Sequence, residues 1–239
     1  MSKPLTGMSA LVTGATRGIG RAIAERLIAD GAAVTGTGTK TRGDVPEGCA
    51  YLSVDFADAA ATAAFAESIT DKGFDILVNN AGINKISPFA DIDPDDFALI
   101  QQINVTAPFL LCRAAVASMK ERGWGRIVNV SSIWGKISKE HRGPYATSKF
   151  AIDGLTTTLA AEYAEFGILA NCVAPGFIDT DLTRNTLGEA GMVELAARVP
   201  ARRLGKPEEI AALVAWLAGP ENTYISGQNI AIDGGFTRV

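Results

Sequence analysis

The chain has 239 residues, which is enough to bury a sizeable core as one domain. Its 47% hydrophobic and 20% charged residues are ordinary for a globular protein and argue against disorder. A formal net charge of −4 argues against binding to nucleic acid or to an anionic membrane, and no apolar run approaches the ~18 residues that cross a bilayer.

Short apolar or β-branched runs alternate with helical stretches along almost the whole chain. The runs predicted as strands are Met8–Val12, Ala33–Thr37, Tyr51–Val54, Ile76–Asn79, Arg126–Val130, Ile168–Ala174 and Asn229–Ile232. The stretches with helical periodicity are Ile19–Asp30, Asp58–Lys72, Pro94–Val105, Pro108–Arg122, Tyr145–Phe166 and Pro207–Leu217. This alternation predicts one doubly wound α/β domain over residues 1–239, with helices on both faces of a seven-stranded, mostly parallel sheet.

The segment Thr180–Arg203 interrupts this alternation. It is long, has mixed polarity and lies between a predicted strand and a predicted helix. Long insertions in compact domains are commonly functional, so we predict a substrate lid over residues 180–203.

A glycine-rich turn joins the first strand to the first helix. Its spacing is Gly14-x-x-x-Gly18-x-Gly20, and the helix follows at once. Glycines at such a turn let the backbone approach a pyrophosphate that binds at the helix N-terminus. The sequence therefore predicts a dinucleotide site here.

The end of the second strand indicates which dinucleotide binds. NAD-binding folds place an acidic residue there, on the ribose 2′-hydroxyl. Here the run from Ala32 to Thr39 contains no acid, Lys40 and Arg42 follow it, and Arg17 lies in the glycine turn. A 2′-phosphate would meet hydroxyls and cations, so NADP(H) is preferred. NAD(H) remains possible if these cations are only solvated loop charges.

Three residues have the order and spacing of a proton-transfer device: Ser132, Tyr145 and Lys149. Pro144 is a favoured first residue of a helix, so Tyr145 and Lys149 lie four residues apart on one helical face. A phenol has a pKa near 10 and is a poor acid or base at neutral pH. We expect the lysine ammonium to lower that pKa.

Together these motifs resemble those of the short-chain dehydrogenase/reductase family over essentially the whole chain. The motifs are Thr13-Gly14-x-x-x-Gly18-x-Gly20, Asn79-Asn80-Ala81-Gly82, Asn104, Ser132, Tyr145-x-x-x-Lys149 and Pro175-Gly176. Within the family, the general look is that of the 3-oxoacyl-(acyl-carrier-protein) reductases. The resemblance implies a Rossmann-type fold, NADPH-dependent reduction of a carbonyl to a secondary alcohol, and a homotetramer or homodimer.

The resemblance also implies roles for individual residues. Tyr145 would donate the proton, Lys149 would assist it and bind the nicotinamide ribose, Ser132 would hold the substrate carbonyl, and Asn104 would anchor a relay water. The residues expected to contact the cofactor are Gly14, Thr16, Arg17, Gly18, Ile19, Gly20, Thr37, Lys40, Asp55, Phe56, Asn80, Ala81, Gly82, Tyr145, Lys149, Pro175, Gly176, Ile178 and Thr180, with Asn79 on the same side. The residues expected to contact the substrate are Ser132, Trp134, His141 and Arg142.

The segment from Lys136 to Gly143 departs from what a plain acyl chain requires. Lys136, Lys139, His141 and Arg142 make it basic. A polar or anionic substrate, such as a sugar acid, a phosphorylated sugar or a keto acid, is therefore an alternative to an acyl thioester. Solvent-facing side chains on a mobile loop would explain the charges equally well. For an acidic acyl carrier, Arg122 and Arg126 remain as docking candidates.

The remaining features bear on location and on rival functions. Three widely spaced cysteines and the lack of a signal-peptide pattern favour a reducing, cytoplasmic compartment without disulfides. A single histidine leaves no basis for a His-rich metal site. A non-catalytic NADP-binding sensor or scaffold is a minor alternative, because all four catalytic positions are occupied.

Overall fold

Seven parallel strands form a single sheet in the computed structural model, which describes residues 3–239 apart from the side chains of Leu182, Thr186 and Leu187. The strands are β1 (Ser9–Val12), β2 (Ala33–Gly38), β3 (Ala50–Ser53), β4 (Ile76–Asn79), β5 (Gly125–Val130), β6 (Ile168–Pro175) and β7 (Asn229–Ile232). Their order is β3-β2-β1-β4-β5-β6-β7, and every neighbouring pair is parallel. The predicted strands are confirmed to within one residue at each end. The order reverses between β1 and β4, where doubly wound folds bind their ligands beyond the carboxyl ends of the strands.

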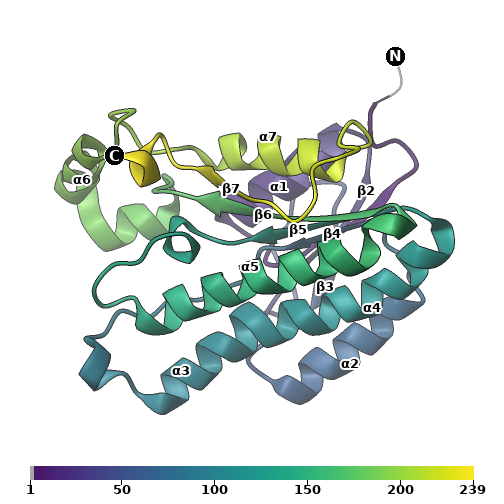
Figure 1. The fold of residues 1–239 in the computed structure, drawn as a ribbon, viewed down its shortest axis with the longest axis horizontal. Coiled ribbons are helices and arrows are strands. Elements are labelled where there is room, and N and C mark those ends of the chain that lie inside the picture. The colour runs from purple at the N-terminus through teal and green to yellow at the C-terminus, as the bar shows by residue number, and fades with distance from the viewer. Residues whose placement is uncertain (1–2) are drawn as a thin grey trace.

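Helices cover both faces of this sheet (Figure 1). They are α1 (Gly18–Ala29), α2 (Ala59–Thr70), α3 (Pro94–Gln101), α4 (Ala107–Arg122), α5 (Gly143–Tyr163), α6 (Asp181–Arg198) and α7 (Pro207–Ala218). Helices α1 and α7 lie on one face, and α2, α4 and α5 lie on the other. The doubly wound α/β architecture predicted from the sequence is confirmed.

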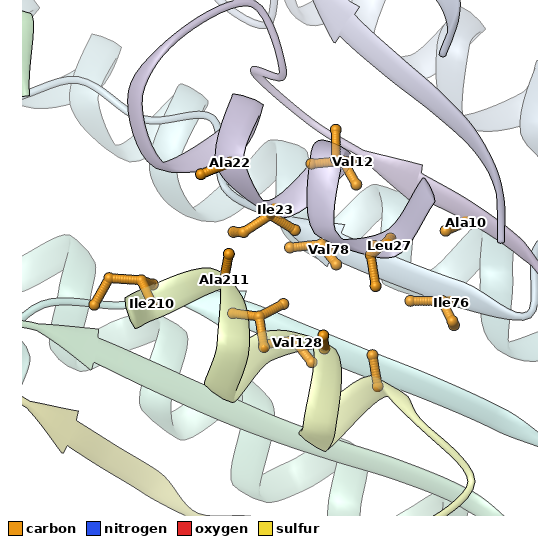
Figure 2. Packing of buried hydrophobic residues seen from close by; sticks show 14 of the residues in the cluster. Ala10, Val12, Ala22, Ile23, Leu27, Ile76, Val78, Val128, Ile210 and Ala211 are labelled. Atoms are coloured by element: carbon orange, nitrogen blue, oxygen red, sulfur yellow. The ribbon is translucent and has the colours of Figure 1, made fainter. Parts of the chain in front are cut away.

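The layer between the sheet and helices α1 and α7 is filled by aliphatic side chains. Figure 2 shows Ile23 of α1 and Ala211 of α7 directed towards each other above Val78 and Val128 of the sheet. Ile23, Val78 and Val128 are at most 1% exposed. Each such side chain contributes about 1.5–3 kcal/mol by leaving water, so this layer fixes α1 and the glycine turn that precedes it.

Helix ends follow the expected local chemistry. The Asp93 carboxylate accepts a hydrogen bond from the Asp95 amide at 2.9 Å, and Pro94 occupies the first turn of α3. Gly123 and Gly167 adopt φ of +66° and +74°, the left-handed conformation that ends a helix at little cost for glycine.

The two helices predicted over Pro94–Val105 and Pro108–Arg122 are one continuous helical run of 29 residues. It includes a π-helical turn, η2 (Gln102–Thr106), and π turns are frequent at functional sites. By length and composition alone the run could cross a membrane, contrary to our expectation from the sequence. Its apolar side chains, such as Leu111 and Met119, pack into the core between the sheet and α2.

The segment predicted as a lid is mostly helical, because Thr180 caps α6 by accepting a hydrogen bond from the Thr183 amide at 3.3 Å. Gly188, with φ of +64°, interrupts the helix. A parallel bridge between Ile178 and Gly205 joins the two ends of the segment. Two bidentate ion pairs flank this bridge, Arg184 with Asp179 and Arg203 with Glu209.

Candidate active site

The glycine turn forms a cradle at the N-terminus of α1. Gly14 and Gly18 have φ of +67° and +55°, and a Cβ added at Gly20 would lie 2.2 Å from the Gly14 carbonyl oxygen. The Asn80 amide holds the turn by donating to the carbonyls of Thr13 at 2.9 Å and Gly14 at 3.2 Å. The first turn of α1 contains no acid, and no side chain caps it. Its free N–H groups therefore suit a pyrophosphate.

The end of β2 suits a 2′-phosphate. It carries no acidic residue, and Arg17 and Lys40 are exposed and form no ion pair with any residue that the structure describes. The Tyr51 hydroxyl donates to the Lys40 carbonyl and so fixes this loop. Thr37 was expected to contact the cofactor, but it is 1% exposed and its hydroxyl accepts from the Gly14 amide at 3.2 Å. Its side chain therefore supports the glycine turn from inside.

On the adenine side, the neighbouring residues Asp55 and Phe56 were both expected to contact the cofactor, but one is exposed and the other is buried. Asp55 is exposed and accepts a hydrogen bond from the Ala57 amide at 3.0 Å, which leaves its carboxylate at the surface. Phe56 is 6% exposed and its ring makes an edge contact with Phe65. The Phe56 side chain therefore belongs to the core, and a contact between Phe56 and the cofactor would come from its backbone.

The residues after β4 divide between core and site. Asn79, the last residue of β4, directs its side chain into the core, where its amide donates to the Asn129 side chain at 2.8 Å, so only its backbone can line the cofactor site. Gly82 lies at the site, since a Cβ added to it would lie 3.2 Å from Asn104 Oδ1 and 3.7 Å from Lys149 Nζ. Ala81 lies between Asn80 and Gly82, and a Cβ added to Gly14 would lie 3.4 Å from its Cβ.

The residues after β6 close the other side of the crevice. Pro175 ends β6, and Gly176 packs tightly against the backbone of Asp233. Ile178 is 7% exposed and belongs to the core cluster on the α1 and α7 face, so its side chain supports this wall from behind. Thr180 faces the glycine turn, since a Cβ added at Gly18 would lie 3.7 Å from its methyl group.

Ser132, Tyr145 and Lys149 come together at the carboxyl end of β5. Ser132 follows this strand, and its hydroxyl accepts from the Trp134 amide at 3.2 Å. Tyr145 lies in the first turn of α5, and Lys149 lies one turn later. The Lys149 ammonium donates to the Val130 carbonyl at 2.8 Å and lies 5.4 Å from the centre of the Tyr145 ring.

The pKa of Tyr145 is not lowered as the sequence led us to expect, because burial of the phenol dominates. Burial raises the pKa of Tyr145, and the groups that oppose this rise are the Ser132 hydroxyl and the Arg142 guanidinium. Burial also lowers the pKa of Lys149 to about 8. The phenol is therefore held in its protonated form at neutral pH, as a proton donor requires.

Sequence reasoning missed the residue that links Asn104 to Tyr145, which is Ser148. Asn104 is 1% exposed; its amide exchanges two hydrogen bonds of 2.9 Å with the backbone of Ile83 and donates to the Ser148 hydroxyl at 3.0 Å. Ser148 then donates to the Tyr145 carbonyl at 2.7 Å. A small polar residue between Tyr145 and Lys149 was a visible signal, but only the fold shows that it faces the π turn.

Two of the residues expected to contact substrate, Trp134 and His141, lie outside the group formed by Ser132, Tyr145 and Lys149. Trp134 is 8% exposed and makes edge contacts with the rings of Phe177 and Phe236, so it forms a buried wall behind Tyr145. His141 is exposed and lines an open groove of about 540 Å³ with Thr147 and other residues. Thr147 is on the face of α5 opposite Tyr145, because two residues turn a helix by about 200°. His141 therefore lies outside the catalytic group.

In the basic segment before α5, two of the four cationic or titratable side chains already have partners and are less available to a substrate than the sequence suggests. The Lys136 ammonium donates to the Asn229 carbonyl on β7 at 2.7 Å. Lys139 pairs with Glu140 at 3.6 Å. Of the cations in this segment, Arg142 is the one whose charge lowers the pKa of Tyr145, against the larger effect of burial.

The arginines considered for carrier docking are committed to other contacts. Arg126 is 4% exposed, and its guanidinium donates to three backbone carbonyls, those of Gly125, Gly167 and Asn222. Arg122 lies 3.3 Å from the Asp75 carboxylate. Both are at the amino ends of the strands, opposite the catalytic residues, and docking of an acyl carrier on them stays a prediction.

Comparisons with known proteins agree with the geometry of the site. Residues 14–237 match the family model described as "Enoyl-(Acyl carrier protein) reductase". The 3-oxoacyl-[acyl-carrier-protein] reductase FabG of Vibrio cholerae is 39% identical over 239 residues, which cover 97% of this chain and 98% of that protein.

Solved structures extend the comparison. A gluconate 5-dehydrogenase from Burkholderia cenocepacia, in complex with NADP and tartrate, is 31% identical with a TM-score of 0.91, and the match covers 100% of this chain and 98% of the other. A blue fluorescent protein from a metagenomic library, in complex with NADPH, is 37% identical with a TM-score of 0.87, covering 98% and 99%. The chain thus belongs to the short-chain dehydrogenase/reductase family and is an NAD(P)-dependent oxidoreductase that acts on alcohol and carbonyl groups.

Proposed function

We propose that the protein reduces a ketone to a secondary alcohol with NADPH. The observation that carries the proposal is the meeting of Ser132, Tyr145 and Lys149 at the carboxyl end of β5, beside the glycine turn. When bound, NADPH supplies the hydride, and the protein supplies position and protons.

Each catalytic residue has one task in this proposal. The Ser132 hydroxyl holds the substrate carbonyl, and the protonated phenol of Tyr145 donates a proton to its oxygen. The Lys149 ammonium stabilises the negative charge that forms on the phenol. Asn104 and Ser148 keep α5 in register with the loop at Ile83 and so position Tyr145.

The cofactor assignment rests on the fit of residues at both ends of the crevice. The cradle formed by Gly14, Gly18 and Gly20 holds the pyrophosphate, and Thr16 and Ile19 flank it. Arg17 and Lys40 bind the 2′-phosphate, which gives NADP(H) its preference over NAD(H). Tyr145 and Lys149 contact the nicotinamide ribose, with Gly82 leaving the space for it.

The first substrate candidate is a 3-oxoacyl thioester. It is supported by the 39% identity to the Vibrio cholerae 3-oxoacyl-[acyl-carrier-protein] reductase over nearly the whole of both chains. The second candidate is a small polar acid, supported by the similarity to a gluconate 5-dehydrogenase.

We also propose that the segment 180–203 closes over the substrate, and that the protein acts in the cytoplasm as a homotetramer or homodimer.

Steady-state assays with acetoacetyl-N-acetylcysteamine and with 5-ketogluconate test this function. We expect NADPH to be consumed with at least one of them, and faster than NADH, because no acid stands at the end of β2 to repel the 2′-phosphate. The faster substrate identifies the class. Failure to consume NADPH with either compound and with simple ketones such as cyclohexanone would contradict the proposal.

The low pKa of Lys149 predicts a pH limit on reduction. Since burial lowers this pKa from 10.5 to about 8, the ammonium is present below about pH 8 and is lost as pH rises through that value. We expect kcat/KM for NADPH, which reports groups of the free enzyme, to fall above about pH 8. Lys149→Arg should move this fall out of the measurable range, because arginine keeps its proton. A flat profile between pH 7 and 10 in the unmodified protein would refute this role.

A further inference from the structure

Arg142 immediately precedes α5, three residues before the catalytic tyrosine. Its side chain is half-buried, and its backbone carbonyl accepts from the Ala146 amide at 2.7 Å, which fixes it against the first turn of the helix. The guanidinium acts electrostatically on the Tyr145 phenol, and the phenol acts on it in return. Since Arg142 is the N-cap of α5 and Tyr145 follows three residues later, the two side chains start from the same turn, and the cation is a neighbour of the catalytic phenol.

This guanidinium is without a partner. Among residues 3–239, apart from the three side chains that the structure leaves undescribed, no carboxylate lies within 4 Å of it and no acceptor receives a hydrogen bond from it. Other arginines of the chain contrast with it: Arg184 and Arg203 each hold a carboxylate in a bidentate pair, and the buried Arg126 donates to backbone carbonyls.

Partial burial without a partner is unfavourable for a cation. Removing it from water weakens its hydration, and burial accordingly lowers the pKa of Arg142. A bound anion would restore the lost interactions. The planar fork of a guanidinium matches a carboxylate in particular, because two parallel N–H groups meet its two oxygens.

The neighbouring cations do not offer the same site. Lys136 is bonded to the Asn229 carbonyl and Lys139 is paired with Glu140, while His141 opens onto the groove on the other side of α5. The carboxylate whose charge raises the pKa of Arg142 is that of the exposed Glu140, which is already paired with Lys139.

From this arrangement we infer that Arg142 binds a carboxylate of the substrate, so that the ketone reduced at Tyr145 belongs to an oxo acid. The inference rests on the proposed function, because it assumes that the carbonyl lies between Ser132 and Tyr145. A carboxylate at Arg142 would also neutralise the cation that favours the phenolate, and would leave Tyr145 a protonated donor. The inference favours the second substrate candidate, a small polar acid, over a 3-oxoacyl thioester, which has a neutral thioester group in place of the carboxylate.

Matched charged and neutral substrates test the inference. We would measure kcat and KM with NADPH for acetoacetate against methyl acetoacetate, 2-oxobutanoate against its methyl ester, and 5-keto-D-gluconate against L-sorbose, which has the same configuration and no carboxylate. For at least one pair the unmodified protein should prefer the acid by about tenfold or more, as expected for a charged hydrogen-bonded pair. Arg142→Gln should lower the ratio of kcat/KM for that acid to kcat/KM for its neutral partner by about tenfold to a hundredfold, mainly through the KM of the acid. Arg142→Lys should recover part of the loss.

Lys139→Gln is the matched control, because it removes the same charge from the same segment without touching Tyr145. It should leave the ratio of acid to neutral substrate unchanged. Equal losses on both members of a pair in Arg142→Gln would mean a structural or proton-tuning role and overturn the inference, as would a similar change in Lys139→Gln. A protein that reduces acetoacetyl-N-acetylcysteamine but none of the acids would also overturn it, while leaving the proposed function intact. Different results would contradict the proposed function itself. These are full activity in a Tyr145→Phe variant, or no reduction of any carbonyl compound by the unmodified protein.

Discussion

Replacing Tyr145 by phenylalanine should lower kcat for ketone reduction by about 10²–10⁴-fold, the usual contribution of a positioned general acid. The phenol is the protonated donor at neutral pH because burial raises its pKa, and phenylalanine removes only the hydroxyl. The ring should keep its contacts with the buried cluster around Trp134. Binding of NADPH, followed by its fluorescence, should therefore change by less than about threefold.

Tyr163→Phe is the matched control for this variant. Tyr163 lies near the end of the same helix, where its ring packs against Phe166, far along the helix from Ser132. It should retain normal kcat. More than a tenth of the original kcat in Tyr145→Phe, with the product confirmed as the alcohol, would remove Tyr145 from the role of proton donor.

Gly20→Ala should unfold the glycine turn locally and destroy the cofactor site. The added methyl group would lie 2.2 Å from the Gly14 carbonyl oxygen and 2.3 Å from the Asn80 amide nitrogen, both of which belong to the hydrogen bond that holds the turn. Overpacking of this kind costs about 1–3 kcal/mol of unfolding free energy, and here it falls on rigid backbone, so the upper part of that range applies. We expect a corresponding drop in urea stability and no measurable binding of NADPH.

Gly18→Ala separates steric overlap from backbone strain in the same turn. Gly18 has φ of +55°, but a Cβ there would meet only the Thr180 methyl group, at an ordinary 3.7 Å. The cost should be about 1 kcal/mol, the usual penalty of a left-handed non-glycine residue. Both variants are compared without cofactor, by urea denaturation. Equal losses in the two variants would show that the overlap at Gly20 is not the reason for its glycine.

The sequence predicted the strands well because each strand is a short apolar run whose period is visible without knowing its neighbours. Ile76–Asn79 and Asn229–Ile232 are found with the same bounds. Ser132, Tyr145 and Lys149 could be predicted for a similar reason. A helix brings positions four apart to one face, and β5 ends just before Ser132.

Side-chain direction and solvation could not be predicted from spacing alone. Lys136 reads as a substrate-binding cation in the sequence, but the fold brings β7 close enough for its ammonium to bond the Asn229 carbonyl. Trp134 follows the catalytic serine, yet Phe236, about a hundred residues away, covers it. The pKa of Tyr145 was misjudged because proximity to Lys149 was visible, whereas the depth of burial depends on the whole fold.

The two ends of the segment 180–203 are held together, and this affects how the chain can evolve. The bridge between Ile178 and Gly205 joins the start and the end of the segment, and the ion pairs of Asp179 and Glu209 lie beside this bridge. Insertions, deletions or replacements inside the segment therefore need not disturb β6 or α7, which carry the fold. If the segment covers the substrate as we propose, substrate range can change through residues 180–203 alone, without change in the catalytic residues or the glycine turn.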